Sequence, residues 1–228
     1  MRLLDLFCGR WGWSRAFAKR GWECVGVDLV KPPEIPTNCD FVCGDILLAS
    51  YDVNDKCFYG LGLSDYEFDF IVASSPCEQF SVHGMKNFHP NPPYPELGIK
   101  LFNHTRQLCE ASGVPYVMEN VRAAQQFVGR AVHHCGPFYL WGNAVPPLLG
   151  QGVKKMTRNN GSMYASVRHL PYREMREAMA KHEASFGGKK NAAATVATIP
   201  PELANCVADY AERLLEQKGL DEQKAKVV

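Results

Sequence analysis

The run Phe70–Ala73 is the feature of this sequence that most constrains the fold. It holds consecutive apolar residues over the length of a short strand, a pattern typical of a parallel sheet that is covered on both faces. The run leads directly into the segment Ser74–Cys77. In doubly wound α/β folds, ligands bind beyond the carboxyl ends of the strands, so Cys77 is a candidate nucleophile. The alternative is a structural thiol, because cysteine is among the residue types most often buried.

The length of 228 residues suits one domain with its own hydrophobic core, or one domain with a small appendage. We expect a cytoplasmic protein with no membrane association, because the sequence has no apolar run of membrane-spanning length and Met1–Asp5 leads into a strand rather than a signal peptide. The nine cysteines show no framework spacing, which favours reduced thiols. Cys39, Cys43 and Cys57 are spaced too loosely for a metal site and lack a fourth ligand, so no metal is predicted.

Basic residues gather in one stretch of a chain whose net charge is only +1. Residues 151–190 hold nine Lys or Arg against three Glu, which gives a local charge of +6. Such a segment on a nearly neutral body suits the phosphate backbone of a nucleic acid. A charged face that is merely solvated is the other interpretation.

The N-terminal residues have the order of a nucleotide-binding unit. A strand over Leu3–Phe7 leads through a glycine turn into a helix over Trp13–Arg20, with Ser14 as its N-cap. The next strand, Cys24–Val27, ends in Asp28. A carboxylate at that point is placed to accept hydrogen bonds from the hydroxyls of a ribose.

A second strand end is expected beside Cys77. The buried strand Val114–Met118 delivers Glu119 to the same edge of the sheet, and a thiol beside a carboxyl group forms a reaction centre rather than a core. Partial desolvation raises the pKa of such a carboxyl group, so that it can donate a proton near neutral pH. A helix N-cap, or an ion pair with Arg122, is the structural alternative for Glu119.

The remaining elements complete an α/β fold with a doubly wound, mostly parallel sheet. We predict a short strand at 40–43, a polar connection at 50–67, a long loop after Cys77, a helix at 98–112, a strand at 138–141, and helices at 173–182 and 200–215.

Several of these segments resemble motifs of the cytosine-5 DNA methyltransferase family, in the same order along nearly the whole chain. The matching segments are Asp5–Gly9 with Gly12 for the cofactor signature, Asp28 and Asp45 for ribose and adenine binding, Pro76–Cys77 with Phe80–Ser81 for the catalytic loop, Glu119–Val121 for the ENV motif, and Ile199–Ala204 for the final helix.

The resemblance implies a Rossmann-like fold of the S-adenosylmethionine-dependent methyltransferase type, with S-adenosylmethionine as cofactor and DNA as partner. Cys77 would add to carbon 6 of cytosine and Glu119 would protonate ring nitrogen 3, so that carbon 5 becomes methylated. The target base would be flipped out of the duplex, and the loop after Cys77 would close behind it. Implied cofactor-binding residues are Phe7, Gly9, Gly12, Asp28, Asp45, Ile46 and Pro76. Implied substrate-binding residues are Gln79, Ser81, Asn120, Arg122 and Arg168.

The sequence departs from the family pattern at several positions. Arg10 and Trp11 replace small residues, Ser75 replaces a proline, and Glu78 replaces a glutamine. A separate target-recognition domain is missing, as in small bacteriophage-type members, which suggests a short target site and a bacterial or phage-infected host cell.

The expected domains follow from these departures. A catalytic and cofactor-binding domain at 1–150 precedes a small basic insert at 151–190, a C-terminal segment and helix at 191–218 that returns to the catalytic domain, and a frayed charged tail at 219–228. Two alternatives stay open at this point: the same chemistry on a free cytidine nucleotide, and a DNA-binding or decoy protein without activity. The sequence does not indicate an oligomeric state.

Overall fold

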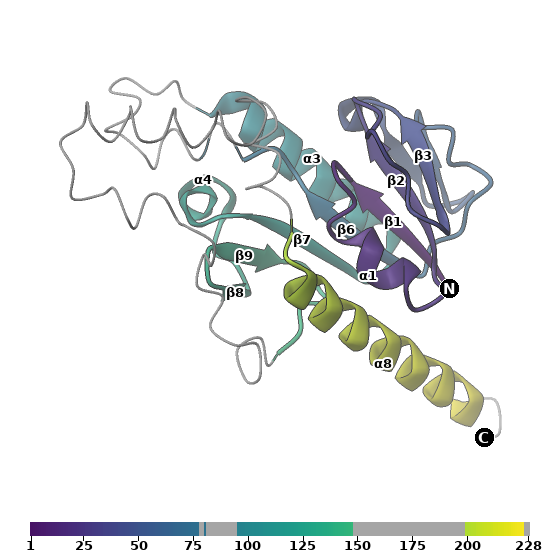
Figure 1. The fold of residues 1–228 in the computed structure, drawn as a ribbon. Coiled ribbons are helices and arrows are strands. Elements are labelled where there is room, and N and C mark those ends of the chain that lie inside the picture. The colour runs from purple at the N-terminus through teal and green to yellow at the C-terminus, as the bar shows by residue number, and fades with distance from the viewer. Residues whose placement is uncertain (78–79, 81–94, 148–198, 226–228) are drawn as a thin grey trace, which may run out of the picture.

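The computed structural model describes residues 1–77, 80, 95–147 and 199–225 (Figure 1). Within them a seven-stranded sheet has the strand order β3-β2-β1-β6-β7-β9-β8. The strands are β1 (Arg2–Leu6), β2 (Glu23–Asp28), β3 (Cys39–Cys43), β6 (Phe70–Ser74), β7 (Tyr116–Val121), β8 (His133–Cys135) and β9 (Phe138–Trp141). Neighbouring strands pair in parallel along the order β3-β2-β1-β6-β7, whereas β9 is antiparallel to both β7 and β8. The predicted α/β fold with a mostly parallel sheet is confirmed.

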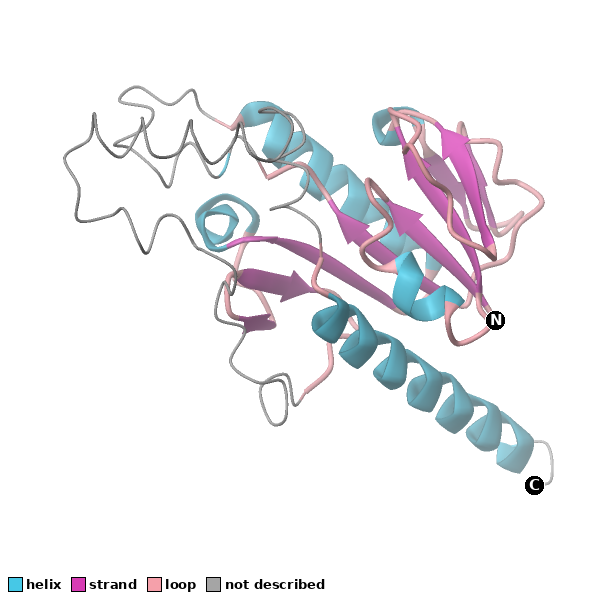
Figure 2. Ribbon diagram, in the orientation of Figure 1, coloured by secondary structure: helices cyan, strands magenta, loops and turns pink. Residues whose placement is uncertain are grey.

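Helices cover both faces of the sheet (Figure 2). They are α1 (Ser14–Ala18), α3 (Glu96–Ser112), α4 (Gln125–Val128) and α8 (Pro201–Ala225), with short 3-10 turns η1 (Ile46–Leu48) and η2 (Arg122–Ala124). Leu3 and Phe70 pack in the cluster under α1 and α8, whereas Leu4 and Ile71 pack in the cluster under α3. Successive strand residues therefore face opposite layers, which explains why these strands are apolar without alternation.

Two predicted segments are more ordered than expected. The polar connection at 50–67 contains a hairpin of β4 (Ser50–Asp52) and β5 (Cys57–Tyr59), and its Phe58 packs in the cluster under α3. The segment predicted as a frayed tail is helical as far as Ala225, where Gln217 donates a hydrogen bond to Asp221 one turn later. Among the residues described, none of the helices has the length and apolar character that crossing a bilayer requires.

Ser14 does not cap α1, and that prediction was wrong. The N-cap residue is Trp13, and no side chain caps this helix. The hydroxyl of Ser14 donates instead to Oδ2 of Asp5 at 2.6 Å, and its backbone N–H donates to the same oxygen at 3.3 Å. A fully buried carboxyl group on β1 is therefore the anchor for the start of the helix.

Trp11 covers the β2–β3 part of the sheet on the α1 side. The connection from β2 to β3 contains no helix, and the fully buried indole of Trp11 lies against Gly26 and edge-on to Phe41. Its ring N–H donates to the main-chain oxygen of Glu34 at 3.0 Å. A Cβ atom on Gly26 would lie 2.3 Å from the nearest Trp11 ring carbon, so residue 26 has to be glycine while Trp11 fills this place.

The first prediction concerns this contact. Gly26→Ala should lower the free energy of unfolding by about 1–3 kcal/mol, because the added methyl group forces the indole out of its place. Urea unfolding measures the loss. Gly219→Ala in α8 is the control, because a Cβ atom there has no neighbour within 4 Å, and it should leave stability unchanged or slightly higher. If the two substitutions have equal effects, Trp11 does not restrict residue 26.

The second prediction concerns Asp5. Burial raises the pKa of this carboxyl group to about 7, so the folded protein binds a proton there that the unfolded chain releases above its ordinary pKa. The folded state consequently loses stability as the pH rises from about 4 towards 7. Asp5→Asn should flatten this slope while keeping an oxygen that accepts from Ser14. Unfolding measured between pH 4 and 8 tests this, and a slope unchanged by the substitution would contradict it.

Candidate active site

The carboxyl ends of β6 and β7 bring the predicted thiol and carboxyl group to one edge of the sheet. Ser74, the last residue of β6, lies opposite Glu119 in the parallel register. Cys77 follows three residues later and is half-buried. β7 is longer than the predicted strand, because pairing with β9 places Glu119 opposite Leu140 and extends the ladder to Val121. Glu119 is therefore held within a strand rather than beyond its end.

Glu119 is a buried acid. Its side chain is 9% exposed, and burial raises its pKa to about 7, while a hydrogen bond from the Ser74 side chain opposes part of that shift. Neither structural alternative is found in the described part of the chain. Val121 is the N-cap residue of η2, and no described ion pair joins Glu119 to Arg122.

Asn120 connects the two strand ends. Its side-chain N–H groups donate to the main-chain oxygen and to the hydroxyl of Ser75, both at 3.0 Å, and its side-chain oxygen accepts from the N–H of Val121 at 2.8 Å. The amide is fully buried. Its observed contacts hold the backbone just before Pro76 and Cys77, whereas its contact with a substrate stays a prediction.

The glycine turn after β1 lies beside Asp28. Phe7 and Gly9 both have positive φ angles, and the N–H of Gly9 donates to Oδ2 of Asp28 at 3.0 Å. The other oxygen of Asp28 accepts from the N–H of Val30 at 3.3 Å. Phe7 is fixed by its N–H, which donates to the carbonyl oxygen of Val27 at 2.8 Å. Backbone and carboxylate thus form one rim at the ends of β1 and β2.

The C-terminal segment returns to this turn. A Cβ atom on Gly12 would lie 2.8 Å from the backbone nitrogen of Ile199, just before α8 begins. Glycine is required at position 12 because another backbone approaches it so closely. The main chain at Ile199 therefore lies directly against the glycine turn.

Asp45 and Ile46 follow β3 at the same edge. Asp45 accepts a hydrogen bond from the N–H of Leu47 at 2.9 Å and caps η1 with its side chain. The side chain of Ile46 is 2% exposed and packs in the core, so its backbone is the part that remains to contact a ligand.

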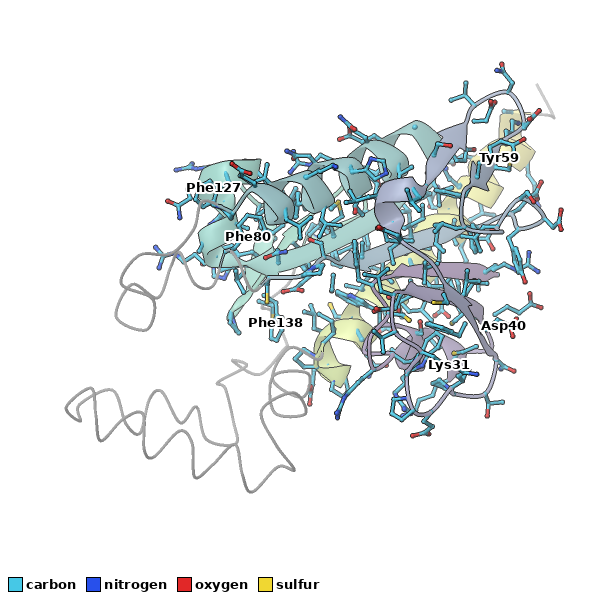
Figure 3. All side chains as sticks on the ribbon, turned by 90° about the horizontal axis from the view of Figure 1, so that it is seen from above. Lys31, Asp40, Tyr59, Phe80, Phe127 and Phe138 are labelled. Carbon is cyan, nitrogen blue, oxygen red and sulfur yellow. The ribbon has the colours of Figure 1, made fainter. Side chains whose placement is uncertain are left out.

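The other predicted site residues differ in what the structure says of them. Pro76 and Arg122 are exposed at the edge where β6 and β7 end. Phe80 is fully buried and stacks on Phe127 with ring centroids 6.0 Å apart (Figure 3), which fixes the position of Phe80 against α4. The predicted residues Gln79, Ser81 and Arg168, the basic insert at 151–190 and the helix at 173–182 lie outside the described residues.

Asp5, named from the sequence only as part of the cofactor signature, has a further feature near this edge, and two residues that the sequence did not select also lie there. Oδ1 of Asp5 is buried and lacks a hydrogen-bond partner among the residues described. Leu29 and Val30, directly after Asp28, are 65% and 73% exposed, unusually high for large apolar side chains. The signals available in the sequence were a charged residue inside an apolar strand and two apolar residues after a strand-end carboxylate.

Within the described ranges, neither a metal site nor the hollow at the far end of the strands involves the residues of this edge. In the part of the chain that the structure describes, no group of three or more His, Cys, Asp or Glu side chains could hold a metal ion, and this includes Cys39, Cys43 and Cys57. A hollow of about 230 Å³ lies at the opposite edge of the sheet, between Arg2, Asn38 and Tyr66. It contains none of the predicted site residues.

The solved structures that are similar to this chain include methyltransferases of low sequence identity. A glycopeptide N-methyltransferase, MtfA, matches with 18% identity and a TM-score of 0.28 over 53% of this chain and 46% of its own. The antibiotic-resistance methyltransferase Kmr matches with 15% identity and a TM-score of 0.27 over 54% of this chain and 59% of its own. The matched region thus spans about half of each relative, and such low scores carry no weight. The curated proteins gave no match.

The family assignment rests on the sequence. The family model for C-5 cytosine-specific DNA methylase matches residues 1–132, more than half of the chain. This region includes the glycine turn, Asp28, Cys77 and Glu119. The resemblance of the motifs is confirmed over this region, and the chain belongs to the C-5 cytosine-specific DNA methylase family, whose members are S-adenosylmethionine-dependent DNA cytosine methyltransferases.

Proposed function

We propose that this protein transfers a methyl group from S-adenosylmethionine to carbon 5 of cytosine in DNA, through a covalent adduct of Cys77 with the base. The observation that carries the proposal is the parallel register of β6 and β7, which sets a buried carboxyl group opposite the last residue before the segment that bears the thiol. Membership of the methylase family supplies the reaction class.

The strand ends offer groups that suit S-adenosylmethionine, which when bound supplies an electrophilic methyl group on its sulfonium. Oδ1 of Asp5 is buried and lacks a hydrogen-bond partner among the residues described, and an ammonium group beside it would keep this carboxyl group ionised. Asp28 is a half-buried acceptor for ribose hydroxyls, and the exposed Leu29 beside it suits the face of a purine. The glycine turn leaves Gly9 exposed next to the carboxylate of Asp28.

Cys77 and Glu119 divide the chemistry on the base. Carbon 5 of cytosine is a weak nucleophile, so the thiolate of Cys77 first forms a bond to carbon 6 while Glu119 donates its proton to ring nitrogen 3. The electron pair of the ring double bond then makes carbon 5 nucleophilic, and carbon 5 accepts the methyl group. Loss of the carbon 5 proton to a base and expulsion of the thiolate restore the double bond, and Glu119 takes back its proton.

The burial of Glu119 suits this role. A carboxyl group with its ordinary pKa is ionised at neutral pH and has no proton to give. The raised pKa of Glu119, about 7, keeps a large fraction of the acid protonated near neutrality. Low exposure also excludes water that would compete with the ring nitrogen for the proton.

A cytosine inside a duplex is out of reach of a strand-end thiol, so we propose that the base is flipped out of the stack. The loop and the basic segment assigned to this step fall outside the described residues, and the family assignment is the support for DNA as the substrate. A free cytidine nucleotide is the second candidate, because it carries the same cytosine ring on which Cys77 and Glu119 would act.

The third prediction tests the nucleophile. Cys77→Ser should abolish transfer of a labelled methyl group to DNA while leaving cofactor binding unchanged, because serine lacks a thiolate. Cys206→Ser, at another half-buried cysteine in α8, is the matched control and should keep full activity. Wild-type protein should also form a covalent adduct with DNA containing 5-fluorocytosine, and Cys77→Ser should not.

The acceptor is varied in the same assay. Duplex DNA, single-stranded DNA and dCMP are compared, and a preference for dCMP would replace DNA as the substrate. No transfer to any of the three by the wild-type protein would exclude the proposed activity. A wild-type protein that binds DNA but forms no adduct with 5-fluorocytosine would then be an inactive DNA-binding protein.

The fourth prediction concerns the proton donor. Methyl transfer should decline as the pH rises through about 7, because ionised Glu119 cannot protonate the ring. Glu119→Gln, which cannot release a proton, should lower kcat by about 10²–10⁴-fold and lose this alkaline limb. A pH–rate profile of both proteins measures the effect, and a wild-type rate in the variant would remove Glu119 from the mechanism.

A further inference from the structure

A hydrogen-bond chain connects the helix after the glycine turn to the buried acid. The indole N–H of Trp13 donates to the hydroxyl oxygen of Ser74 at 2.9 Å. Ser74 lies opposite Glu119 in the register of β6 and β7, and a hydrogen bond from the Ser74 side chain is the cause that lowers the pKa of this acid against the effect of burial. The side chain of the N-cap residue of α1 is thus connected through one side chain of β6 to one side chain of β7.

The indole of Trp13 occupies one acceptor site of the Ser74 hydroxyl group. An indole nitrogen can only donate, so the Ser74 oxygen has to accept from Trp13. A hydroxyl group has a single proton, and the Ser74 proton is therefore free to point at Glu119. Donation from Trp13 also polarises the hydroxyl and makes it a better donor.

The direction of the Ser74 hydroxyl determines where Glu119 holds its own proton. In a neutral carboxylic acid, the oxygen that accepts a hydrogen bond is the carbonyl oxygen, because the other oxygen carries the proton. One oxygen of Glu119 accepts the hydrogen bond that the Ser74 hydroxyl donates. The acid proton is then on the second oxygen, the one that is not turned towards Ser74.

We propose that Ser74, oriented by Trp13, is a positioning residue that fixes the Glu119 carboxyl group so that its proton faces ring nitrogen 3 of the target base. This inference rests on the proposed function, because it names the residues that prepare the proton donor of that reaction. Trp13 follows the glycine turn directly, so the same contact ties the alignment of the acid to the backbone that borders the cofactor.

The surroundings of Glu119 favour Ser74 as the group that acts on it. β9 places Leu140 opposite Glu119 on its other side, and an aliphatic side chain has no hydrogen-bonding group. The titratable groups on the neighbouring elements are Cys77 beyond β6, Tyr139 on β9 and Arg122 in η2. Among the described residues, the causes of the shifted pKa of Glu119 are burial and Ser74, without a charged group.

The kinetic test compares four proteins: wild type, Ser74→Ala, Trp13→Phe and the double variant. Ser74→Ala should lower kcat about three- to tenfold at the optimal pH, the cost of one lost hydrogen bond, with the KM for S-adenosylmethionine unchanged. Its alkaline limb should move to higher pH, because the hydroxyl no longer stabilises the ionised acid. Ser74→Thr retains the hydroxyl and should restore both kcat and the limb.

The double variant separates positioning from packing. Trp13→Phe keeps a buried ring and should lower kcat less than Ser74→Ala does, and the double variant should be no slower than Ser74→Ala alone, because Trp13 acts through Ser74. Trp22→Phe is the matched control, since this fully buried indole belongs to the same cluster but donates to Glu212 at 3.1 Å. It should leave kcat and the limb unchanged.

A direct titration separates this inference from the proposed function. The carboxyl carbon of Glu119 is followed by NMR in protein carrying ¹³C-labelled glutamate, with Glu119→Gln for assignment, and Ser74→Ala should raise its pKa. If the wild-type protein transfers no methyl group, the proposed function fails, and the titration still decides the contact. An unchanged pKa of Glu119 in Ser74→Ala would overturn the inference, and so would an unchanged alkaline limb in that variant. The inference would also fail if the loss of kcat in the double variant equalled the product of the losses in Trp13→Phe and Ser74→Ala.

Discussion

The parallel pairing of β6 with β7 is the interaction on which the rest of the site depends. It sets Ser74 against Glu119 and carries Cys77 to the same edge. Because both faces of these strands are covered, Glu119 is removed from water, and its raised pKa follows from that burial rather than from a neighbouring charge. The helices of the two layers therefore do more than stabilise the sheet, since they provide the low-polarity surroundings in which a carboxyl group keeps its proton at neutral pH.

The C-terminal helix takes part in the same arrangement. Leu203 and Val207 of α8 are fully buried in the cluster that also holds Trp13, and Arg20 beside α1 forms an ion pair with Asp209 at 2.6 Å. The approach of Ile199 to Gly12 joins the end of the chain to its beginning. Residues far apart in sequence thus fix the position of α1, and through the indole of Trp13 they fix one side of the acid.

The sequence predicted the features that depend on local pattern. Apolar runs identified the strands, and the polar residues after them identified the edge where Cys77, Glu119 and Asp28 gather. Features that depend on distant partners were missed. Ser14 looks like an N-cap from its neighbours, but Asp5 nine residues earlier takes its hydroxyl. The contact from Trp13 to Ser74 spans 61 residues and leaves no trace in either local pattern. The three-residue strands β4 and β5 are also too short to show a period.

Two of the departures from the family pattern, Trp11 and Ser75, have compensating contacts. Trp11 has a φ of +63°, which costs a bulky residue about 1–2 kcal/mol. Burying a large aromatic side chain contributes about 1.5–3 kcal/mol, enough to offset that strain, provided that Gly26 leaves room for the ring. Ser75 replaces a proline, yet its hydroxyl gives Asn120 a second acceptor that proline lacks. Trp11 therefore fits the fold only beside Gly26, so reverting Trp11 alone to a small residue would leave Gly26 facing a cavity rather than restore the family arrangement.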